Sequence, residues 1–324
     1  MAGTVAVTAR RAADGFSRGN ETAVLTRGLA AAGWTVRLFD WRELAPAHDS
    51  TGRLPRALAT SDVLLHRYLG SLRERHMRSV RRYVAWARER FAGAIVNDPV
   101  LLPYGCHKQY LFDYQRRGFP VVPSSYRPSR SGLAALEEAA AEAGWHAAVV
   151  KPIDGELCLD VHLLAEVSPQ HYQAMASRTS GFVLQPFLEG IRHGQRSVLL
   201  VVVGGEPVPV YGMVKVPSGW HAKASLSTVR EVVPSSEERE LAVDVLCAWP
   251  GGRIVNGFAR VDFVADHARL HVLEIETVNP EGGLECASWG TQRRWVDHFS
   301  QMLEESARTV GSCSSGTGVP PRRG

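Results

Sequence analysis

The sequence predicts an α/β protein that folds into several lobes, and three observations support this fold class. The chain has 324 residues, of which 45% are hydrophobic and 22% are charged, a composition typical of globular proteins with more than one packed core. Its first hundred residues alternate apolar strand-like runs with amphipathic helices. Its last third contains mostly alternating or β-branched runs, which favour an antiparallel sheet.

The first part of the chain, residues 1–103, is expected to form an open α/β lobe. Strands are predicted at residues 4–8, 35–39, 62–65 and 94–96, and helices at residues 21–32 and 73–90. The second helix is rich in arginine, but Met77, Val80, Val84, Ala87 and Phe91 recur at a helical spacing. We therefore expect its arginines to lie on a solvated face and not to form a nucleic-acid-binding surface.

Two further lobes are expected after residue 103. Residues 104–180 should form a small central lobe, and residues 181–309 a C-terminal lobe built on an antiparallel sheet. Helices are predicted at residues 108–117, 132–143, 169–176, 237–249 and 291–307, and strands at residues 147–152, 161–164, 182–187, 197–203, 208–216, 228–233, 257–264 and 271–277. Residues 310–324 are rich in Gly, Ser and Pro, which predicts a disordered tail.

Composition also excludes several classes of protein. The five cysteines form no CxxC pair, so we expect reduced thiols and neither a disulfide framework nor a zinc knuckle. The sequence has no membrane-length apolar window and does not begin with a signal-peptide pattern, which predicts a cytoplasmic protein without membrane partners. The first lobe carries no GxGxxG motif and no Walker lysine.

Lysine is scarce in this chain. Only four of the 37 basic residues are lysines, namely Lys108, Lys151, Lys215 and Lys223. Because arginine is the usual basic residue in this chain, a lysine indicates a site that needs a compact positive charge, as in phosphate binding. Chance survival is the alternative, and composition alone does not separate the two.

Three carboxylates form the sharpest local signal. Glu274 and Glu276 lie two residues apart on a predicted strand and therefore share one face, and Asp262 lies on the neighbouring strand. Clustered carboxylates repel one another unless a cation lies among them, and oxygen ligands of this kind suit Mg²⁺. Alternating charge on a solvated strand is the simpler alternative.

Lys151 ends an apolar strand just before a loop, where it can reach a phosphate. This signal is weak by itself. It gains weight from residues 183–187, Val-Leu-Gln-Pro-Phe, which follow at the distance expected of a strand whose backbone pairs with an adenine.

Taken in order, these motifs resemble the ATP-grasp superfamily, in particular bacterial glutathione synthetases and actinobacterial ligases of specialised metabolism such as the O-ureidoserine cyclo-ligase. The resemblance covers about residues 90–305. It rests on the occurrence of several motifs in the order in which the family carries them, and not on any one motif. The matching segments are Asn97-Asp-Pro followed by Lys108, then residues 118–123, 151–155, 183–187, 194–197, 205–208 and 213–217, and finally Asp262, Glu274 and Glu276 ending at Pro280.

The resemblance implies an ADP-forming ligase that joins a carboxylate to an amine through an acyl phosphate, acting on an amino-acid-like small molecule in bacterial specialised metabolism. Its cofactors would be ATP and one or two Mg²⁺ ions, for which Mn²⁺ can substitute. The implied metal ligands are Asp262, Glu274 and Glu276. The implied nucleotide-binding residues are Lys108, Lys151, Asp154 and Gly155 for the phosphates, Gln185, Pro186, Phe187 and Leu188 for adenine, and Glu189 for the ribose. Lys215, Lys223 and Arg260 are the implied catalytic residues.

The chain also departs from the family pattern. The loop after Lys151 has a single glycine, and it carries Glu156 and Asp160, which we expect to face either a cationic substrate group or solvent. Glu276 stands where glutathione synthetases carry Asn. A ligase that adds amino acids to a protein terminus and a non-catalytic nucleotide-binding protein both stay open as alternatives, as does a homodimer.

Overall fold

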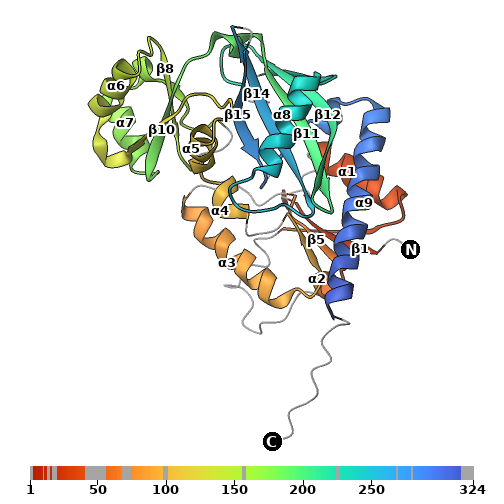
Figure 1. Ribbon diagram of the computed structural model, residues 1–324. Coiled ribbons are helices and arrows are strands. Elements are labelled where there is room, and N and C mark those ends of the chain that lie inside the picture. The colour runs from red at the N-terminus through yellow and green to blue at the C-terminus, as the bar shows by residue number, and fades with distance from the viewer. Residues whose placement is uncertain are drawn as a thin grey trace, which may run out of the picture.

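The computed structural model describes residues 3–9, 11–12, 15–16, 20–40, 56–67, 74–97, 101–154, 158–222, 227–267, 269–278 and 280–314. Three larger sheets, each with its own helices, make up this part of the chain (Figure 1). The mixed architecture confirms the predicted fold class.

The N-terminal sheet has four parallel strands in the order β4-β1-β5-β6. They are β1 (Thr4–Thr8), β4 (Thr35–Phe39), β5 (Val63–Leu65) and β6 (Ala94–Val96). Along β1, Val5 and Val7 pack in one core with residues of α1 (Asn20–Ala31) and α9 (Trp289–Ser314), whereas Ala6 packs with α3 (Glu74–Arg90). Burial on both faces explains the apolar run of Val5, Ala6 and Val7 in β1.

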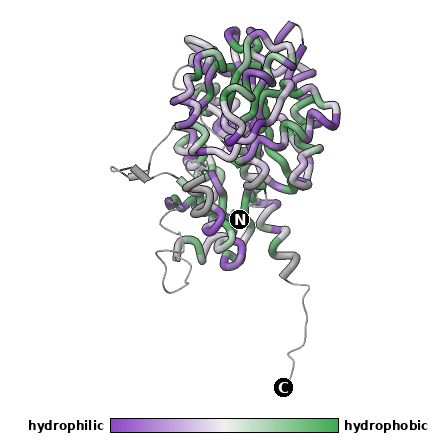
Figure 2. The backbone as a smooth tube through the Cα atoms, turned by 90° about the vertical axis from the view of Figure 1, so that its left-hand side faces the viewer, coloured by the Kyte–Doolittle hydropathy of each residue, from purple (hydrophilic) through white to green (hydrophobic). Residues whose placement is uncertain are grey.

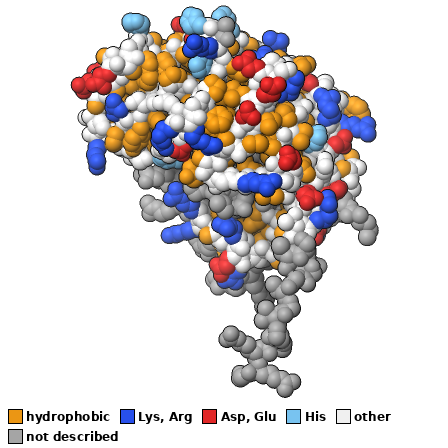
Figure 3. All heavy atoms as spheres, in the orientation of Figure 1, with side chains coloured by type: hydrophobic (Ala, Val, Ile, Leu, Met, Phe, Trp, Pro, Cys, Tyr) orange, Lys and Arg blue, Asp and Glu red, His pale blue; other side chains and the backbone are white. Residues whose placement is uncertain are grey.

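The arginine-rich helix α3 is amphipathic, as the sequence predicts. Val84, Ala87 and Phe91 are buried against the sheet, and Arg81 and Arg88 are exposed. On the face drawn in Figure 3, basic and acidic side chains are interspersed among the described residues.

The central sheet is antiparallel, in the order β7-β10-β8-β9. Its strands are β7 (Ser125–Pro128), β8 (Ala148–Pro152), β9 (His162–Leu163) and β10 (Gly181–Pro186). Residues of β8 and β10 pack in one core with α6 (Leu133–Glu142) and α7 (Pro169–Ala176). Because β10 pairs with both β7 and β8, this sheet extends past residue 180.

The C-terminal sheet has five antiparallel strands in the order β13-β12-β11-β14-β15. They are β11 (Gln195–Val203), β12 (Glu206–Pro217), β13 (Ser227–Val232), β14 (Gly257–Asp266) and β15 (Arg269–Glu276). Side chains of β11 alternate between two cores. Leu199 and Val201 pack with α9, and Leu200 packs with α5 (Gln109–Arg116) and α8 (Ser236–Cys247).

Shorter elements complete the described chain. These are β2 (Arg11–Ala12), β3 (Gly15–Phe16), α2 (Arg56–Ala59), α4 (Leu102–Gly105), and the 3-10 turns η3 (Ser129–Ser131), η4 (Leu164–Glu166), η5 (Glu189–His193) and η7 (Leu284–Cys286).

Helix α9 joins the first and third sheets. Trp295, Phe299 and Leu303 lie in a core to which both sheets contribute, and hydrophobic segments run through the body of the molecule in Figure 2. Val310 packs against the same core, and α9 continues to Ser314, past residue 310 where the sequence predicts a disordered tail. Packing of Val310 against the core supports the end of this helix.

A buried ion pair adds a second link between these sheets. Glu21 of α1 pairs with Arg67, which follows β5, and its carboxylate accepts hydrogen bonds from the backbone N–H groups of Gly282 and Gly283 at 2.8 and 3.1 Å. The N-terminal lobe is thereby tied to the loop after β15. No helix in the described part of the chain is long and apolar enough to cross a membrane.

Candidate functional site

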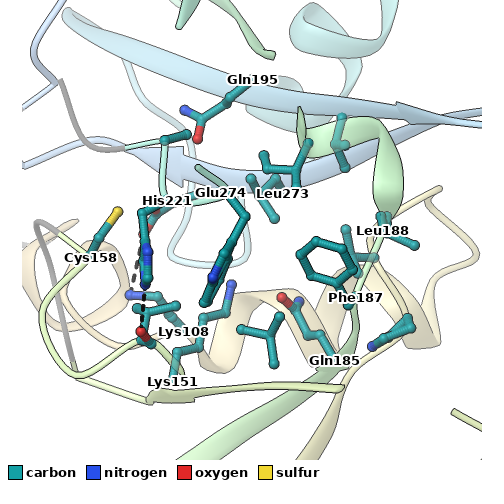
Figure 4. A pocket seen from close by; sticks show the side chains of 18 of the residues that line it. Lys108, Lys151, Cys158, Gln185, Phe187, Leu188, Gln195, His221, Leu273 and Glu274 are labelled. Atoms are coloured by element: carbon teal, nitrogen blue, oxygen red, sulfur yellow. Dashed lines mark hydrogen bonds and ion pairs between the residues drawn. The ribbon is translucent and has the colours of Figure 1, made fainter. Parts of the chain in front are cut away.

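A cavity of about 860 Å³, counting its open mouth, lies between the central and C-terminal sheets (Figure 4). It is lined by Lys108, Val122, Val149, Lys151, Pro152, Cys158, Leu159, Val161, Gln185, Pro186, Phe187, Leu188, Ile191, Gln195, Trp220, His221, Ala222, Val264, Leu273 and Glu274. One end is apolar and the other is charged, which suits a ligand with an aromatic part and an anionic part.

Aromatic and aliphatic side chains form the apolar end. The Phe187 and Trp220 rings meet edge to face with centroids 5.8 Å apart, and Trp220 stacks on His221 at 3.7 Å. Gln185 is held in place by a hydrogen bond of 2.8 Å from its side-chain amide to the Ser124 hydroxyl. In Figure 4, Phe187 and Leu188 lie on the opposite side of the cavity from Lys108 and Lys151.

Two lysines and a carboxylate form the charged end. Lys108 precedes α5, and its Nζ lies 3.2 Å from Oε1 of Glu274 on β15. Lys151 is only 7% exposed on β8, and burial lowers its pKa to about 8 although Glu274 opposes the shift. Strand pairing fixes this lysine, because it lies opposite Val183 of β10.

The three predicted carboxylates meet beside this end of the cavity. Asp262 lies opposite Glu274 in the ladder between β14 and β15, and each carboxylate of the Asp262, Glu274 and Glu276 cluster offers an oxygen within 4.8 Å of the others. Arg260 binds both oxygens of Asp262, at 2.7 and 2.8 Å, and donates to Glu276 at 2.7 Å. The Ser197 hydroxyl donates to Asp262 at 2.7 Å.

The electrostatics of this cluster fit a divalent cation. Burial opposes ionisation of Asp262 and Glu274, but Arg260 lowers the pKa of Asp262, and Lys108 and Lys151 lower that of Glu274. Glu276 differs, because burial and the two neighbouring carboxylates raise its pKa to about 7 despite Arg260. A negative charge is therefore left poorly compensated on oxygen ligands of the kind that Mg²⁺ prefers.

Most of the predicted site residues come together around the cavity. Seven line it: Lys108, Lys151, Gln185, Pro186, Phe187, Leu188 and Glu274. Asp262, Glu276 and Arg260 adjoin it through the carboxylate cluster, and Lys215 of β12 is close enough to lower the pKa of Asp262. Gly155 and Lys223 lie outside the described residues, as does Glu156.

Two predicted residues have other partners. Glu189 does not line the cavity, and its carboxylate, 69% exposed, pairs with Arg192 at 2.7 Å. The 3-10 turn η5 points this side chain outward, and Gln195 lines the cavity instead. Asp154 accepts a hydrogen bond from the Thr179 hydroxyl and does not line the cavity.

Sequence reasoning missed several residues of the cavity wall. Trp220 and His221 were not predicted as wall residues, and Cys158 carried no signal by its spacing. Val264 lies two residues from Asp262, so strand alternation could have placed it on the same face. Leu273 is adjacent to Glu274 and lines the cavity with it at an irregularity in the ladder between β14 and β15, which alternation does not predict. The rest depends on loop conformation.

Comparison with known proteins gives structural relatives. No protein-family model and no curated protein matches the sequence. The chain is similar in structure to D-cycloserine synthetase DcsG, with a TM-score of 0.70 and 22% identity over 93% of this chain and 100% of the other.

Two further structures are similar over nearly their whole length. The ATP-grasp ligase PsnB, solved with a minimal precursor, gives a TM-score of 0.60 and 14% identity over 93% of this chain and 100% of the other. The D-alanine–D-alanine ligase from Bacillus anthracis gives a TM-score of 0.61 and 13% sequence identity, over 96% of this chain and 99% of the other. The chain therefore has the ATP-grasp fold, which its ordered motifs resemble.

Proposed function

We propose that this protein is an ATP-dependent, ADP-forming ligase that joins a carboxylate to an amine on an amino-acid-like small molecule. The observation that carries the proposal is the polarity of the cavity, whose apolar end leads to two lysines and a three-carboxylate cluster. The structural relatives named for D-cycloserine and for D-alanine–D-alanine support amino acids as the first substrates to test.

The cavity accommodates a nucleotide in one orientation. The adenine would lie between Phe187, Leu188 and Ile191, with Gln185 at its edge. The phosphates would then reach Lys108 and Lys151 at the charged end. Gln195, in place of Glu189, is the side chain that we assign to the ribose.

Asp262, Glu274 and Glu276 would hold one or two Mg²⁺ ions, which neutralise charge on the β- and γ-phosphates during transfer. A substrate carboxylate oxygen attacks the γ-phosphorus, and the bond to the β-phosphate oxygen breaks to release ADP. An amine then attacks the acyl carbon, phosphate leaves, and the amine nitrogen loses a proton. Lys215 is the described lysine that we expect to face the transferred phosphoryl group.

Hydroxylamine trapping tests this proposal without knowledge of the natural amine. The protein is incubated with MgATP, hydroxylamine and single D- or L-amino acids, and both ADP and the amino-acid hydroxamate are measured. We expect at least one amino acid to yield the two products in equal amounts, because hydroxylamine captures the acyl phosphate.

A matched pair of variants controls the trapping experiment. Glu274→Gln should abolish both products, whereas Glu142→Gln, on the exposed surface of α6, should not. MgADP binding without hydroxamate formation from any amino acid would favour the non-catalytic alternative or a larger substrate. Failure to bind MgADP would reject the nucleotide site itself.

A further inference from the structure

A second group of metal-binding side chains lies in the central lobe, apart from the carboxylate cluster. Asp160, His162 and His171 each offer a ligand atom within 4.8 Å of the others. They come from three places in the fold, namely the loop after β8, the edge strand β9 and the first turn of α7. All three residues are half-buried, so that an ion can enter from solvent.

The spacing is wider than that around a bound ion, but a modest movement of the side chains would close it. Three ligands held tetrahedrally at about 2.0–2.2 Å from Zn²⁺ lie about 3.3–3.6 Å apart, so ligand atoms that now lie within 4.8 Å of one another would approach by at most about 1.5 Å. The two imidazoles already meet, with ring centroids 4.3 Å apart and planes at 71°. Arg178 pairs with Oδ1 of Asp160 at 3.1 Å, and a carboxylate has room for such a partner as well as a metal.

The scaffold holds both histidines rigidly. His162 lies opposite Val150 in the ladder between β8 and β9. Helix α7 begins with Pro169, and its N-cap Ser168 accepts a hydrogen bond from the backbone N–H of His171 at 3.2 Å. The neighbouring Tyr172 anchors the helix by donating to the carbonyl of Ser129 at 2.8 Å. Ligands on regular elements lose little freedom on binding a metal.

We propose that Asp160, His162 and His171 form a binding site for a divalent transition-metal ion of the Zn²⁺ type, distinct from the Mg²⁺ site. Two imidazoles and one carboxylate favour Zn²⁺, Ni²⁺ or Co²⁺ over Mg²⁺, which prefers oxygen ligands. Three protein ligands leave at least one coordination position for water.

This site adjoins the nucleotide cavity. Val161, between two of the ligands, lines the cavity, and its carbonyl contacts Nε2 of His221 at 2.9 Å. His221 in turn stacks on Trp220. Figure 4 shows His221 at the cavity. A metal ion that fixes Asp160 and His162 therefore also fixes a piece of the cavity wall.

Zn²⁺ titration of the full chain tests the site. The protein is freed of metals with EDTA, transferred to buffer with excess Mg²⁺ and no nucleotide, and titrated with Zn²⁺ against a chromogenic chelator. We expect one Zn²⁺ per chain. His162→Gln and His171→Gln should each weaken binding about 10- to 100-fold or more, since even residues that only orient a ligand cost that much when mutated.

Two control variants make the result specific. His146→Gln changes an exposed histidine of the same lobe and should leave Zn²⁺ affinity within about twofold of wild type, provided thermal melting shows that all variants are folded. Glu274→Gln should keep the Zn²⁺ stoichiometry, which separates this site from the proposed catalytic one. Equal affinity in wild type and both His162 and His171 variants, or no Zn²⁺ binding at all, would overturn the proposal and leave the histidine pair as an aromatic contact.

Discussion

At the residue scale, Arg260 holds two of the three clustered carboxylates and determines how much charge each can bear. Its guanidinium binds both oxygens of Asp262 but reaches Glu276 with one nitrogen. The pKa of Asp262 is accordingly lowered, whereas that of Glu276 is raised to about 7. Glu276 is thus the carboxylate that most needs a further cation, and it is the one that departs from the glutathione synthetase pattern.

Glu276→Gln should stabilise the metal-free protein above neutral pH. A carboxyl with a raised pKa binds its proton more tightly in the folded than in the unfolded state, so its contribution to stability is lost as pH rises from about 4.5 to about 7. The amide cannot ionise and avoids this loss. We expect the melting temperature in EDTA to exceed that of wild type at pH 8 and the difference to shrink at pH 5. An unchanged or lower melting temperature at pH 8 would contradict the assigned charge state.

Glu276→Gln should also lower the rate of ADP formation at least about 100-fold, which corresponds to about 2.7 kcal/mol of transition-state stabilisation.

Lys151 makes nucleotide binding dependent on protons. With a pKa of about 8, it is partly neutral at pH 8.5, and bound phosphates favour its charged form. We expect MgADP binding at pH 8.5 to take up part of a proton, seen as a binding enthalpy that changes with the ionisation enthalpy of the buffer. Uptake should be much smaller at pH 7, where the lysine is already mostly charged. Buffer-independent enthalpy at pH 8.5 would show that the phosphates do not reach this lysine.

At the element scale, the sequence predicted most of the strands and helices. The strands β11 to β15 follow from β-branched runs between turns, and α3 follows from apolar residues at a helical spacing. The strand β7 was not predicted, because Ser-Tyr-Arg-Pro has no apolar alternation and is a strand only through pairing with β10. The turn η5, which points Glu189 away from the cavity, also depends on tertiary packing.

The site was predictable where side chains lie on strands. Alternation placed Asp262, Glu274 and Glu276 together before the structure was known, and the structure brings their oxygens within 4.8 Å. Trp220 and His221 lie in a loop, whose conformation no short-range pattern determines. Their place in the cavity wall therefore required the fold.

Gly190 tests whether η5 must lie close to β14 to shape the cavity. A Cβ at this position would be 1.7 Å from the carbonyl oxygen of Ala265, so Gly190→Ala should push η5 away from the sheet. Because Ile191 and Leu188 line the apolar end, we expect MgADP affinity to fall at least tenfold, a loss of about 1.4 kcal/mol. Gly219→Ala is the matched control, since its Cβ would meet no atom within 4 Å. Calorimetry that gives equal affinities for the two folded variants would remove η5 from the binding site.

At the scale of the whole molecule, the cores divide the chain into a larger and a smaller unit. The N-terminal and C-terminal sheets share a core through α9, and Glu21 and Arg67 tie them together a second time. The central sheet has its own core, built around Leu136, Tyr172 and Phe182. Residues of the central strands, such as Lys151 and Gln185, line the cavity together with Val264 and Glu274 of the third sheet, so the cavity lies where the two units meet.

This division predicts that the smaller unit opens more easily than the larger one when no ligand is bound. A bound nucleotide should reduce this difference. Without ligand, backbone amides of residues 133–186 should exchange with deuterium at a lower opening free energy than those of β11 and β14, because a small separate core can open by itself. MgADP contacts both units under the proposed function, and it stabilises whatever conformation it binds in proportion to its concentration over its Kd. Saturating MgADP should therefore slow exchange in β8 and β10 far more than in α9, as measured by mass spectrometry of peptides. Lys151→Met, expected to bind MgADP poorly, should show the unliganded pattern at the same nucleotide concentration. Uniform protection of the ligand-free chain would mean that the central sheet does not open independently, and equal slowing everywhere would mean that the nucleotide does not bind where the two units meet.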